Sequence, residues 1–451
     1  MTDPPAAGPA DGPDHDPRGA LIDGAVALGL RAAARRFGTP LFVTDLATLD
    51  VACAAVAGAF PDPIVRQYSV KANDVPGVIS AIAARGFGAN VVSRGEWELA
   101  RHAGVPDDRI TLEGVGKTPA DLRAAARAAA AGRPLRWVAL ESPEEAAELA
   151  DAARHLGGHP IDVLYRLNPD VTPETLAGLA VGVGGSKFGM TETEIAAAIE
   201  VGGGPNGVLR PRGIHLHVGS QLGAVDAWRE AVRKALALAA LWRGSIAMFD
   251  TVDLGGGFPV RPAGEPAPEP ARFARELVPL LAAVPADRRP TRLAIEPGRA
   301  LIARAGWLIG RVLHARERGG RQVVLDTGMT ELIRPALYGA HHPVIALTSS
   351  GRDIVAARGK MAGRGTTLRD RDHEVAPTRV EGPICEATDA LGSHELPPLQ
   401  RGDLVAIADA GAYGSSLSST YNGRRRPAQV LLWPDGRLVL TRRRGTLRSL
   451  A

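Results

Sequence analysis

Polar side chains stand where the predicted β-strands end, and they are of the types that carry out chemistry. The stretch QYSVKAN, residues 67–73, is an apolar strand that ends at Lys71, whose amine is a potential nucleophile. Carboxylates, imidazoles and guanidiniums end other strands and offer proton transfer and anion binding. The set is Lys71, Ser93, Glu113, Glu141, Arg166, Asn168, His217, Ser220, Glu296 and Arg299. Each residue has a structural explanation by itself, but their convergence indicates an active site.

Two of these strand ends have patterns that suit a ligand. In GIHLHVGSQ, residues 213–221, apolar residues alternate with His215 and His217, so both imidazoles should face the interior. The two histidines could form a hydrogen-bonded pair in the core or bind a metal ion. No carboxylate lies near them in the sequence, so we predict no metal site. In DLGGGFP, three glycines at 255–257 follow a strand and either expose N–H groups to an anion or form a tight turn.

Strands and helices alternate along the first two thirds of the chain. Eight short apolar runs are separated by helical stretches rich in alanine and leucine, at 64–70, 87–92, 109–112, 135–140, 161–167, 213–218, 251–254 and 292–295. This alternation predicts a parallel sheet, and eight units predict a closed (β/α)8 TIM-like barrel with its chemistry at the C-terminal strand ends. An open Rossmann sheet is the alternative, but its G-x-G-x-x-G motif is absent after the first strand.

The chain divides into a barrel and a second, mostly β domain. Residues 1–20 are rich in Pro, Gly and Asp and predict a disordered tail, and residues 21–45 are expected to join the β domain. The barrel should span residues 46–305 and the β domain residues 306–451. Within the β domain, the polar and basic segment 346–379 is expected to be a long loop or insertion.

The composition excludes several classes of function. The formal net charge is only +4, which does not suggest a nucleic-acid partner. No apolar run approaches the roughly 20 residues of a membrane span, and the start of the chain does not resemble a signal peptide. Two cysteines, Cys53 and Cys385, do not make a disulfide framework, so a reducing, cytoplasmic location is expected.

Ten motifs occur in the order seen in the diaminopimelate decarboxylases, which the chain resembles over about residues 30–445. Among them are YSVKAN, YRLNPDV, GGSKFGM, GIHLHVGSQL, DLGGGFP, AIEPGR, EGPICEATDAL and GAYGSSLSSTYN. The family belongs to the fold-type III pyridoxal-phosphate decarboxylases. The resemblance implies an alanine-racemase-like architecture, with the barrel followed by the β domain, and a head-to-tail homodimer.

The resemblance also assigns the cofactor site. Lys71 would hold pyridoxal 5′-phosphate as a Schiff base, and His217 would stack on its ring. Glu296 would keep the pyridine nitrogen protonated, so that the ring accepts the electron pair left when CO2 departs. The other residues that would bind the cofactor are Arg166, Ser220, Asp253, Gly255, Gly256, Gly257, Arg299 and Tyr413.

The implied reaction is decarboxylation at the D-centre of meso-2,6-diaminopimelate, which gives L-lysine and CO2. Arginine binds a carboxylate with a planar fork and a glutamate binds an ammonium group. By resemblance the substrate would contact Arg299, Arg334, Tyr338, Glu386 and Tyr413. Cys385 would reach into the partner subunit's site and reprotonate Cα; the alternative is a small, buried hydrophobic residue.

Two departures from the family pattern leave alternatives open. Asn90 stands where the family usually has aspartate, near the cofactor lysine, and the lost charge would alter the pKa of the Schiff base. The segment 346–379 is longer than usual and would either overhang the site or form a surface loop. A decarboxylase of another amino acid, larger or carrier-tethered, in secondary metabolism is therefore an alternative, and a non-catalytic pyridoxal-phosphate-binding protein is another.

Overall fold

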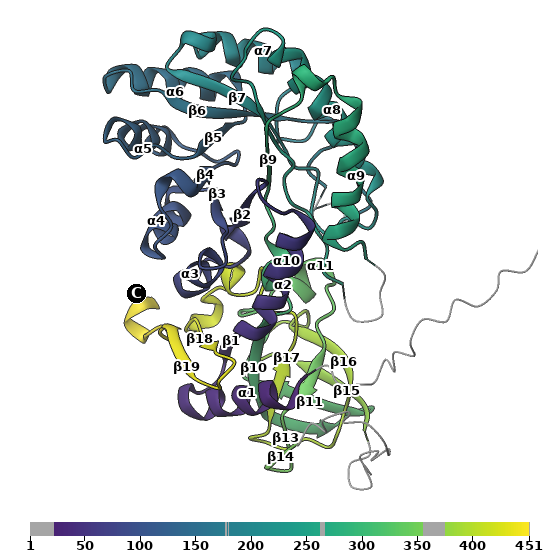
Figure 1. The fold of residues 1–451 in the computed structure, drawn as a ribbon. Helices are drawn as coiled ribbons and strands as arrows, with labels where there is room; N and C mark the ends of the chain where they lie inside the picture. Colours follow the sequence, from purple (N-terminus) through teal and green to yellow (C-terminus); the bar gives the residue numbers. More distant parts are fainter. Residues whose placement is uncertain (1–21, 176–177, 179, 262–266, 355–374, 451) are drawn as a thin grey trace, which may run out of the picture.

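A computed structural model describes residues 22–450 except 176–177, 179, 262–266 and 355–374. A closed barrel of eight strands forms one half of the molecule, and a nine-stranded sheet lies at its side (Figure 1). This arrangement confirms the predicted fold. The predicted tail, residues 1–20, lies outside the described residues. Among the described helices, none combines the length and apolar character that crossing a membrane requires.

The barrel closes because each strand pairs in parallel with its neighbours and the last strand returns to the first. Val65 pairs with Ala294 and Arg66 with Ile295 at this closure. Each strand overlaps one of the eight predicted apolar runs. The strands are β2 (Val65–Ser69), β3 (Gly88–Val91), β4 (Ile110–Leu112), β5 (Trp137–Leu140), β6 (Ile161–Leu167), β7 (Leu209–Leu216), β8 (Thr251–Asp253) and β9 (Arg292–Ile295).

Helices cover the outside of the barrel, and several begin at a polar cap just after a strand. The Ser93 side chain accepts a hydrogen bond from the Glu96 backbone N–H at 3.2 Å, so this strand-end residue caps a helix. Thr118 and Asp121 form a capping box. The helices are α2 (Leu46–Ala59), α3 (Pro76–Ala83), α4 (Arg94–His102), α5 (Pro119–Ala130), α6 (Pro143–His155), α7 (Glu192–Val201), α8 (Asp226–Arg243) and α9 (Pro270–Ala283).

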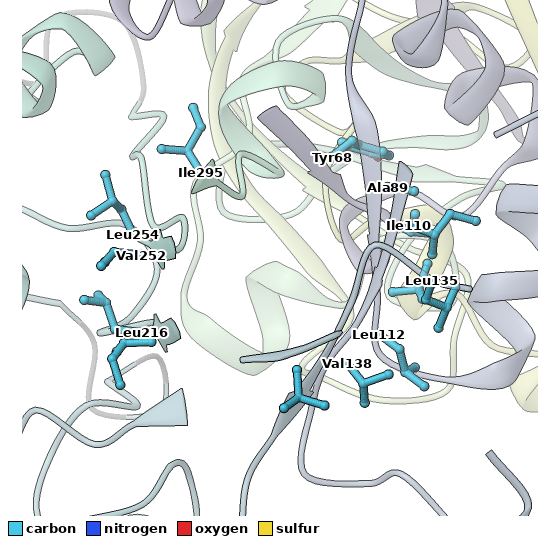
Figure 2. Packing of buried hydrophobic residues seen from close by; sticks show 14 of the residues in the cluster. Tyr68, Ala89, Ile110, Leu112, Leu135, Val138, Leu216, Val252, Leu254 and Ile295 are labelled. Atoms are coloured by element: carbon cyan, nitrogen blue, oxygen red, sulfur yellow. The ribbon is translucent and has the colours of Figure 1, made fainter. Parts of the chain in front are cut away.

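Alternation along the strands separates two layers of core. Outward residues such as Val138, Leu216 and Ile295 belong to one large apolar cluster with the covering helices (Figure 2). The intervening residues Trp137, Ala139, Leu164 and Ala294 form a separate buried cluster. Because strand side chains alternate between faces, this second cluster lies inside the barrel and makes it a packed core rather than a pore.

The second sheet takes one strand from the N-terminal region. β1 (Leu41–Asp45) pairs antiparallel with β10 and parallel with β18, and α1 (Gly24–Phe37) packs against this sheet. Its other strands are β10 (Gly306–Glu317), β11 (Arg321–Leu325), β12 (Val344–Ala346), β15 (Ala376–Glu381), β16 (Ala390–Leu396), β17 (Leu404–Ile407), β18 (Ala428–Leu432) and β19 (Leu438–Arg442). Of two further short helices, α10 (Arg299–Ile302) packs against α2 of the barrel and α11 (Arg334–Tyr338) lies against β16 of this sheet.

The prediction that residues 346–379 form a loop is wrong at both ends of the segment. β13 (Thr348–Ser349) pairs with β14 (Arg352–Asp353), and β15 pairs with both β11 and β16. In β15 only Thr378 and Val380 are buried, so its sequence lacks the apolar run that marks most strands. Residues 355–374 lie outside the described residues, so the expectation that this segment overhangs the site stays a prediction.

The β domain is fixed to the barrel next to Lys71. The Tyr413 N–H donates to the Ala72 carbonyl at 2.7 Å, and the Asn73 side-chain amide donates to the Gly411 carbonyl at 3.0 Å. The Gly411 N–H in turn donates to the Ala303 carbonyl at 3.1 Å. These bonds hold residues 411–413 against the turn that carries Lys71.

Substituting Gly306 with alanine should destabilise the protein at this junction. A Cβ at this position would overlap the Gly411 backbone, and overpacking of this kind costs about 1–3 kcal/mol. Thermal unfolding should show a lower Tm. The matched control is Gly58→Ala in α2, where a Cβ meets nothing within 4 Å and alanine favours the helix by about 0.5–1 kcal/mol. Equal Tm values for the two variants would contradict the close contact.

Candidate active site

The same alternation that sorts the core turns a set of polar side chains into the barrel. Tyr165 and Leu167 belong to the outer cluster, so Arg166 between them faces inward, and His215 does so between Ile214 and Leu216. The other buried polar residues that face inward on the strands are Gln67, Ser69, Asn90, Thr111, Thr251 and Asp253. The inward direction predicted for His215 is thus observed.

Lys71 lies in a short 3-10 turn, Val70–Ala72, directly after β2. Its Nζ is 3.1 Å from Glu113 Oε1, at the end of β4, and 34% of its side-chain surface remains accessible. Burial alone would lower the pKa of Lys71, but the charges of Glu113, Tyr413 and Glu296 outweigh burial and raise it. Lys71 is therefore held as an ammonium at the edge of an open space.

A buried imidazole connects Glu113 to the glutamate of the EPGR motif. His215 Nε2 lies 3.1 Å from Glu113 Oε2 and 3.3 Å from Glu296 Oε1. Asn90 Nδ2 also donates to Glu296 Oε1. Burial would lower the pKa of His215, but the two carboxylates raise it to about 10, so the ring is an imidazolium between two acids.

The carboxylates of this cluster differ in their ionisation. Burial opposes the charge of Glu113, but Lys71 and His215 hold its pKa well below the usual range. Burial and the charge of Glu113 raise the pKa of Glu296. Glu113, His215 and Glu296 also offer three potential metal-ligand atoms within 4.8 Å of one another. No carboxylate lies near His215 in the sequence, but the fold brings Glu113 and Glu296 to it from distant strand ends.

Lys71 opens into a cavity of about 450 Å³ whose lining is strongly cationic. Lys71, Arg166, Arg299 and Arg334 line it, whereas Glu113 is the one carboxylate among the lining residues. Arg166 forms an ion pair of 2.5 Å with Glu141. Arg299 and Arg334 have no carboxylate partner among the described residues, so the cavity is suited to a ligand with several negative charges.

One wall of the cavity is formed by Ser220, Arg299 and Tyr413. Arg299 donates to Ser220 Oγ at 3.3 Å, while its buried Nε has no hydrogen-bond partner. The Arg299 guanidinium also lies 4.7 Å from the centre of the Tyr413 ring. Tyr413 has a φ of 55°, a conformation that costs about 1–3 kcal/mol and that non-glycine residues adopt mainly at functional sites.

His217 lines the cavity and is neutral. Burial, together with the charges of Lys71 and Arg166, holds its pKa well below the usual range. Its Nδ1 accepts a hydrogen bond of 3.1 Å from the Gly256 N–H. The ring is thus fixed in orientation by the glycine segment and carries no charge that would repel the neighbouring cations.

The three glycines mainly allow close packing of backbone. A Cβ at 255, 256 or 257 would overlap the carbonyl oxygen of Leu216, Glu296 or Gly219, respectively. The Gly255 N–H donates to Asp253 Oδ1 at 3.0 Å, so Asp253 shapes this segment and does not itself line the cavity. Two of the three N–H groups expected to face an anion therefore have partners within the protein.

A second cavity of about 530 Å³ adjoins the first. Arg299, Arg334 and Tyr338 line both, and the Arg334 guanidinium lies 5.9 Å from the centre of the Tyr338 ring. Burial and the charge of Arg299 lower the pKa of Arg334 to about 10, and its Nε donates to His342 Nε2 at 3.4 Å. The predicted substrate residues Arg334 and Tyr338 thus stand at the border of the two spaces.

Cys385 and Glu386 lie apart from these cavities within one chain. Cys385 is exposed, and neither residue lines either cavity. Glu386 accepts a hydrogen bond of 2.6 Å from the Tyr421 hydroxyl. Within one chain, this pair is therefore separate from the predicted site residues that line the cavity at Lys71.

Sequence reasoning assigned no role to Glu113 or His215 at Lys71. The signal was present, because Glu113 ends a predicted strand and His215 alternates with apolar neighbours. What was missing was the proximity, since residues 71, 113, 215 and 296 lie on four different strands or strand ends.

Substituting Gly256 with alanine should weaken binding of pyridoxal 5′-phosphate, the cofactor that the resemblance implies. The added Cβ would displace the Glu296 carbonyl and approach the His217 ring, which moves two candidate contacts at once. We expect the Kd, measured by titration of the apoprotein, to rise by about tenfold or more, equivalent to about 1.4 kcal/mol. Gly58→Ala should leave the Kd unchanged, and an unaltered Kd in Gly256→Ala would refute the prediction.

Comparison with known proteins agrees with this geometry. The family described as "Pyridoxal-dependent decarboxylase, pyridoxal binding domain" matches residues 46–303. The diaminopimelate decarboxylase of Aquifex aeolicus is 34% identical over 426 residues, 92% of each chain. That of Deinococcus radiodurans is 35% identical over 419 residues, 92% of this chain and 96% of the relative.

A solved structure extends the comparison to the fold. Diaminopimelate decarboxylase from Helicobacter pylori complexed with L-lysine superposes with a TM-score of 0.81 at 28% identity, covering 93% of this chain and 98% of that one. Sequence and fold thus match over both the barrel and the β domain. The chain belongs to the diaminopimelate decarboxylase family of pyridoxal-dependent decarboxylases, whose cofactor is pyridoxal 5′-phosphate.

Proposed function

We propose that this protein removes CO2 from meso-2,6-diaminopimelate to form L-lysine. The observation that carries the proposal is the cavity at Lys71, where four cationic side chains meet one carboxylate. The phosphate of the cofactor and the two carboxylates of this substrate are anionic groups that these cations can bind. The curated relatives named above are diaminopimelate decarboxylases, and the Helicobacter pylori structure is complexed with L-lysine.

The residues present fit pyridoxal 5′-phosphate. When bound, the cofactor supplies an electron sink for the pair left by the departing CO2. Lys71 provides the amine that holds it, and Arg299, Ser220 and Tyr413 offer cationic and hydroxyl donors to its phosphate. The unpartnered Nε of Arg299 supports this assignment, because a buried donor without an acceptor is costly.

His217 and Glu296 are assigned to the ring. A neutral His217 presents an uncharged face at the cavity wall. Glu296 is a buried carboxyl group that retains a proton more readily than usual, so it suits a hydrogen bond to a ring nitrogen. The Asp253–Gly257 segment holds both residues, because the Gly256 N–H donates to His217 Nδ1 and the Glu296 N–H donates to the Gly255 carbonyl. Arg166 lines the same cavity.

Arg334 favours a substrate with a second carboxylate. Its guanidinium is buried, lines the cavity and has no carboxylate partner among the described residues. An incoming carboxylate would supply that partner through a bidentate contact. An amino acid that ends in an amine alone, such as ornithine, would leave the guanidinium unpaired, and a larger substrate could extend into the adjoining cavity of about 530 Å³.

A homodimer in the cytoplasm completes the proposal. Cys385 is exposed and does not line the cavity of its own chain, so its thiol would contribute to the active site of a partner subunit. There it would donate a proton to Cα, and Glu386 would accept the ammonium group of the substrate. Both cysteines are free thiols, which suits a reducing compartment.

Two alternatives to this proposal differ from it in the substrate, if any, that the protein would decarboxylate. A decarboxylase of another amino acid would release CO2 from a different substrate and leave meso-diaminopimelate unchanged. A non-catalytic pyridoxal-phosphate-binding protein would bind the cofactor and release no CO2 from any amino acid. Neither alternative explains Arg334 together with Cys385 and Glu386 as well as diaminopimelate decarboxylation does.

The cofactor-loaded protein should convert meso-diaminopimelate to lysine, as measured by mass spectrometry of the products. Lys71→Ala should abolish turnover, because the amine that holds the cofactor is lost. Lys117→Ala is a matched control, since Lys117 also pairs with a glutamate, the half-buried Glu145, at 3.1 Å but does not line the cavity. If lysine does not form while ornithine or another amino acid is decarboxylated, the substrate assignment is wrong.

Mixing two inactive variants should restore activity if sites are shared between subunits. Cys385→Ala alone should lower kcat by about 10²–10⁴-fold, as expected for loss of a general acid. Unfolding and refolding it together with Lys71→Ala would give heterodimers with one intact site, worth roughly a quarter of the wild-type activity. No recovery in the mixture, with both variants dimeric by light scattering, would argue against a shared site.

A further inference from the structure

Glu113 is a buried carboxylate in contact with Lys71 for which neither the cofactor nor the substrate supplies a reason. Among the described residues, it is the carboxylate in ion-pair contact with Lys71 Nζ, at 3.1 Å. A buried lysine–glutamate pair is weak evidence for a stabilising role, because desolvation of both charges offsets their attraction. The position therefore suggests a function in handling the charge of Lys71.

The neighbouring strand explains why this charge is at position 113. β3 lies between β2 and β4, and Asn90 is in register with Ser69 on one side and Thr111 on the other. Asn90 donates to Glu296, so a carboxylate at position 90 would face Glu296 directly and repel it. An amide at 90 and a carboxylate at 113 together provide one negative charge at Lys71, and His215 lies between that carboxylate and Glu296.

His215 completes the arrangement. Its Nε2 contacts the Glu113 oxygen that does not face Lys71, and it also contacts Glu296. Each carboxylate oxygen of Glu113 thus has its own cationic neighbour, Lys71 on one side and His215 on the other. The glutamate is held in place at the end of β4 with one oxygen directed at Nζ.

We propose that Glu113 is a positioning residue that accepts the proton of Lys71 and keeps a counter-charge at its nitrogen. The inference rests on the proposed function only in requiring that Lys71 hold pyridoxal 5′-phosphate. Before the nitrogen pair of Lys71 can form a bond to an aldehyde carbon, its ammonium must lose one proton, which moves to Glu113 Oε1. Glu113 would then give this proton to the aldehyde oxygen, which leaves as water, so Glu113 is again a carboxylate beside the bonded Lys71 nitrogen and no further reactant is needed.

Other charged groups also act on this nitrogen, and the test must separate them from Glu113. From the elements packed around Lys71 and Glu113, the acidic groups are Glu96, Asp253, Glu296 and Tyr413, and the basic groups are Arg166, His215 and His217. None of the acidic groups in this set is in ion-pair contact with Nζ in the described structure, whereas Glu113 is.

The test is a pH titration of the visible absorbance of the holoenzyme without substrate, which reports protonation of the cofactor-bound Lys71 nitrogen. A negative neighbour favours the protonated form, so Glu113→Gln should move the midpoint to lower pH, by about 1–3 units. Glu113→Asp retains the charge and should move the midpoint less. Glu145→Gln is the matched control, because Glu145 pairs with Lys117 at the same 3.1 Å outside the cavity, and it should leave the midpoint unchanged.

An unchanged midpoint in Glu113→Gln, or an equal shift in Glu145→Gln, would overturn the inference. A shift specific to Glu113→Gln, smaller in Glu113→Asp, would support it. Loading of the apoprotein with cofactor, followed by stopped-flow absorbance, should also slow in Glu113→Gln, because the proton acceptor for Lys71 is lost. Since no substrate is present in either measurement, a wrong substrate assignment would not alter these results.

Discussion

An imidazolium shared by two buried carboxylates is the interaction on which the site depends. Glu113 and Glu296 are 3% and 2% exposed, and His215 between them is fully buried. Two carboxylates brought this close in a medium of low polarity would drive one another to the neutral form. His215, with Lys71 on one side and Asn90 on the other, allows both glutamates to be buried at the base of a cavity that binds anions.

This interaction is possible because side chains alternate between the two faces of each barrel strand. Each strand buries one set of apolar side chains under the helices and turns the intervening residues inward. Towards one end, the interior is filled by Trp137, Ala139, Leu164 and Ala294. At the C-terminal strand ends, the inward residues are polar and charged, and they contact each other because the strands form a closed barrel. Rigid strands thus position groups whose charges would otherwise keep them apart.

The β domain contributes side chains that complete the cavity wall. It holds Tyr413 in a strained conformation against the turn of Lys71, and it carries Arg334 and Tyr338 to the rim of the cavity. Hydrogen bonds between residues 411–413 of this domain and Ala72, Asn73 and Ala303 of the barrel hold the two parts together. The remaining predicted residues, Cys385 and Glu386, do not line the cavity of their own chain, which is why we include a second subunit in the proposed function.

The sequence by itself determined the eight strands, the barrel, the following β domain and the cofactor class. Those features depend on local patterns, namely apolar runs, glycines after strands and short motifs, and each pattern is complete within about ten residues. The strand β15 was missed because its buried positions are few and its exposed residues polar. Only the tertiary structure decided that Glu113, His215 and Glu296 form one cluster with Lys71, and that Asn90 is an uncharged partner of Glu296. Lys71 and Glu296 are more than 200 positions apart in the sequence. The contacts within this cluster depend on barrel closure and strand register, which no local sequence pattern predicts.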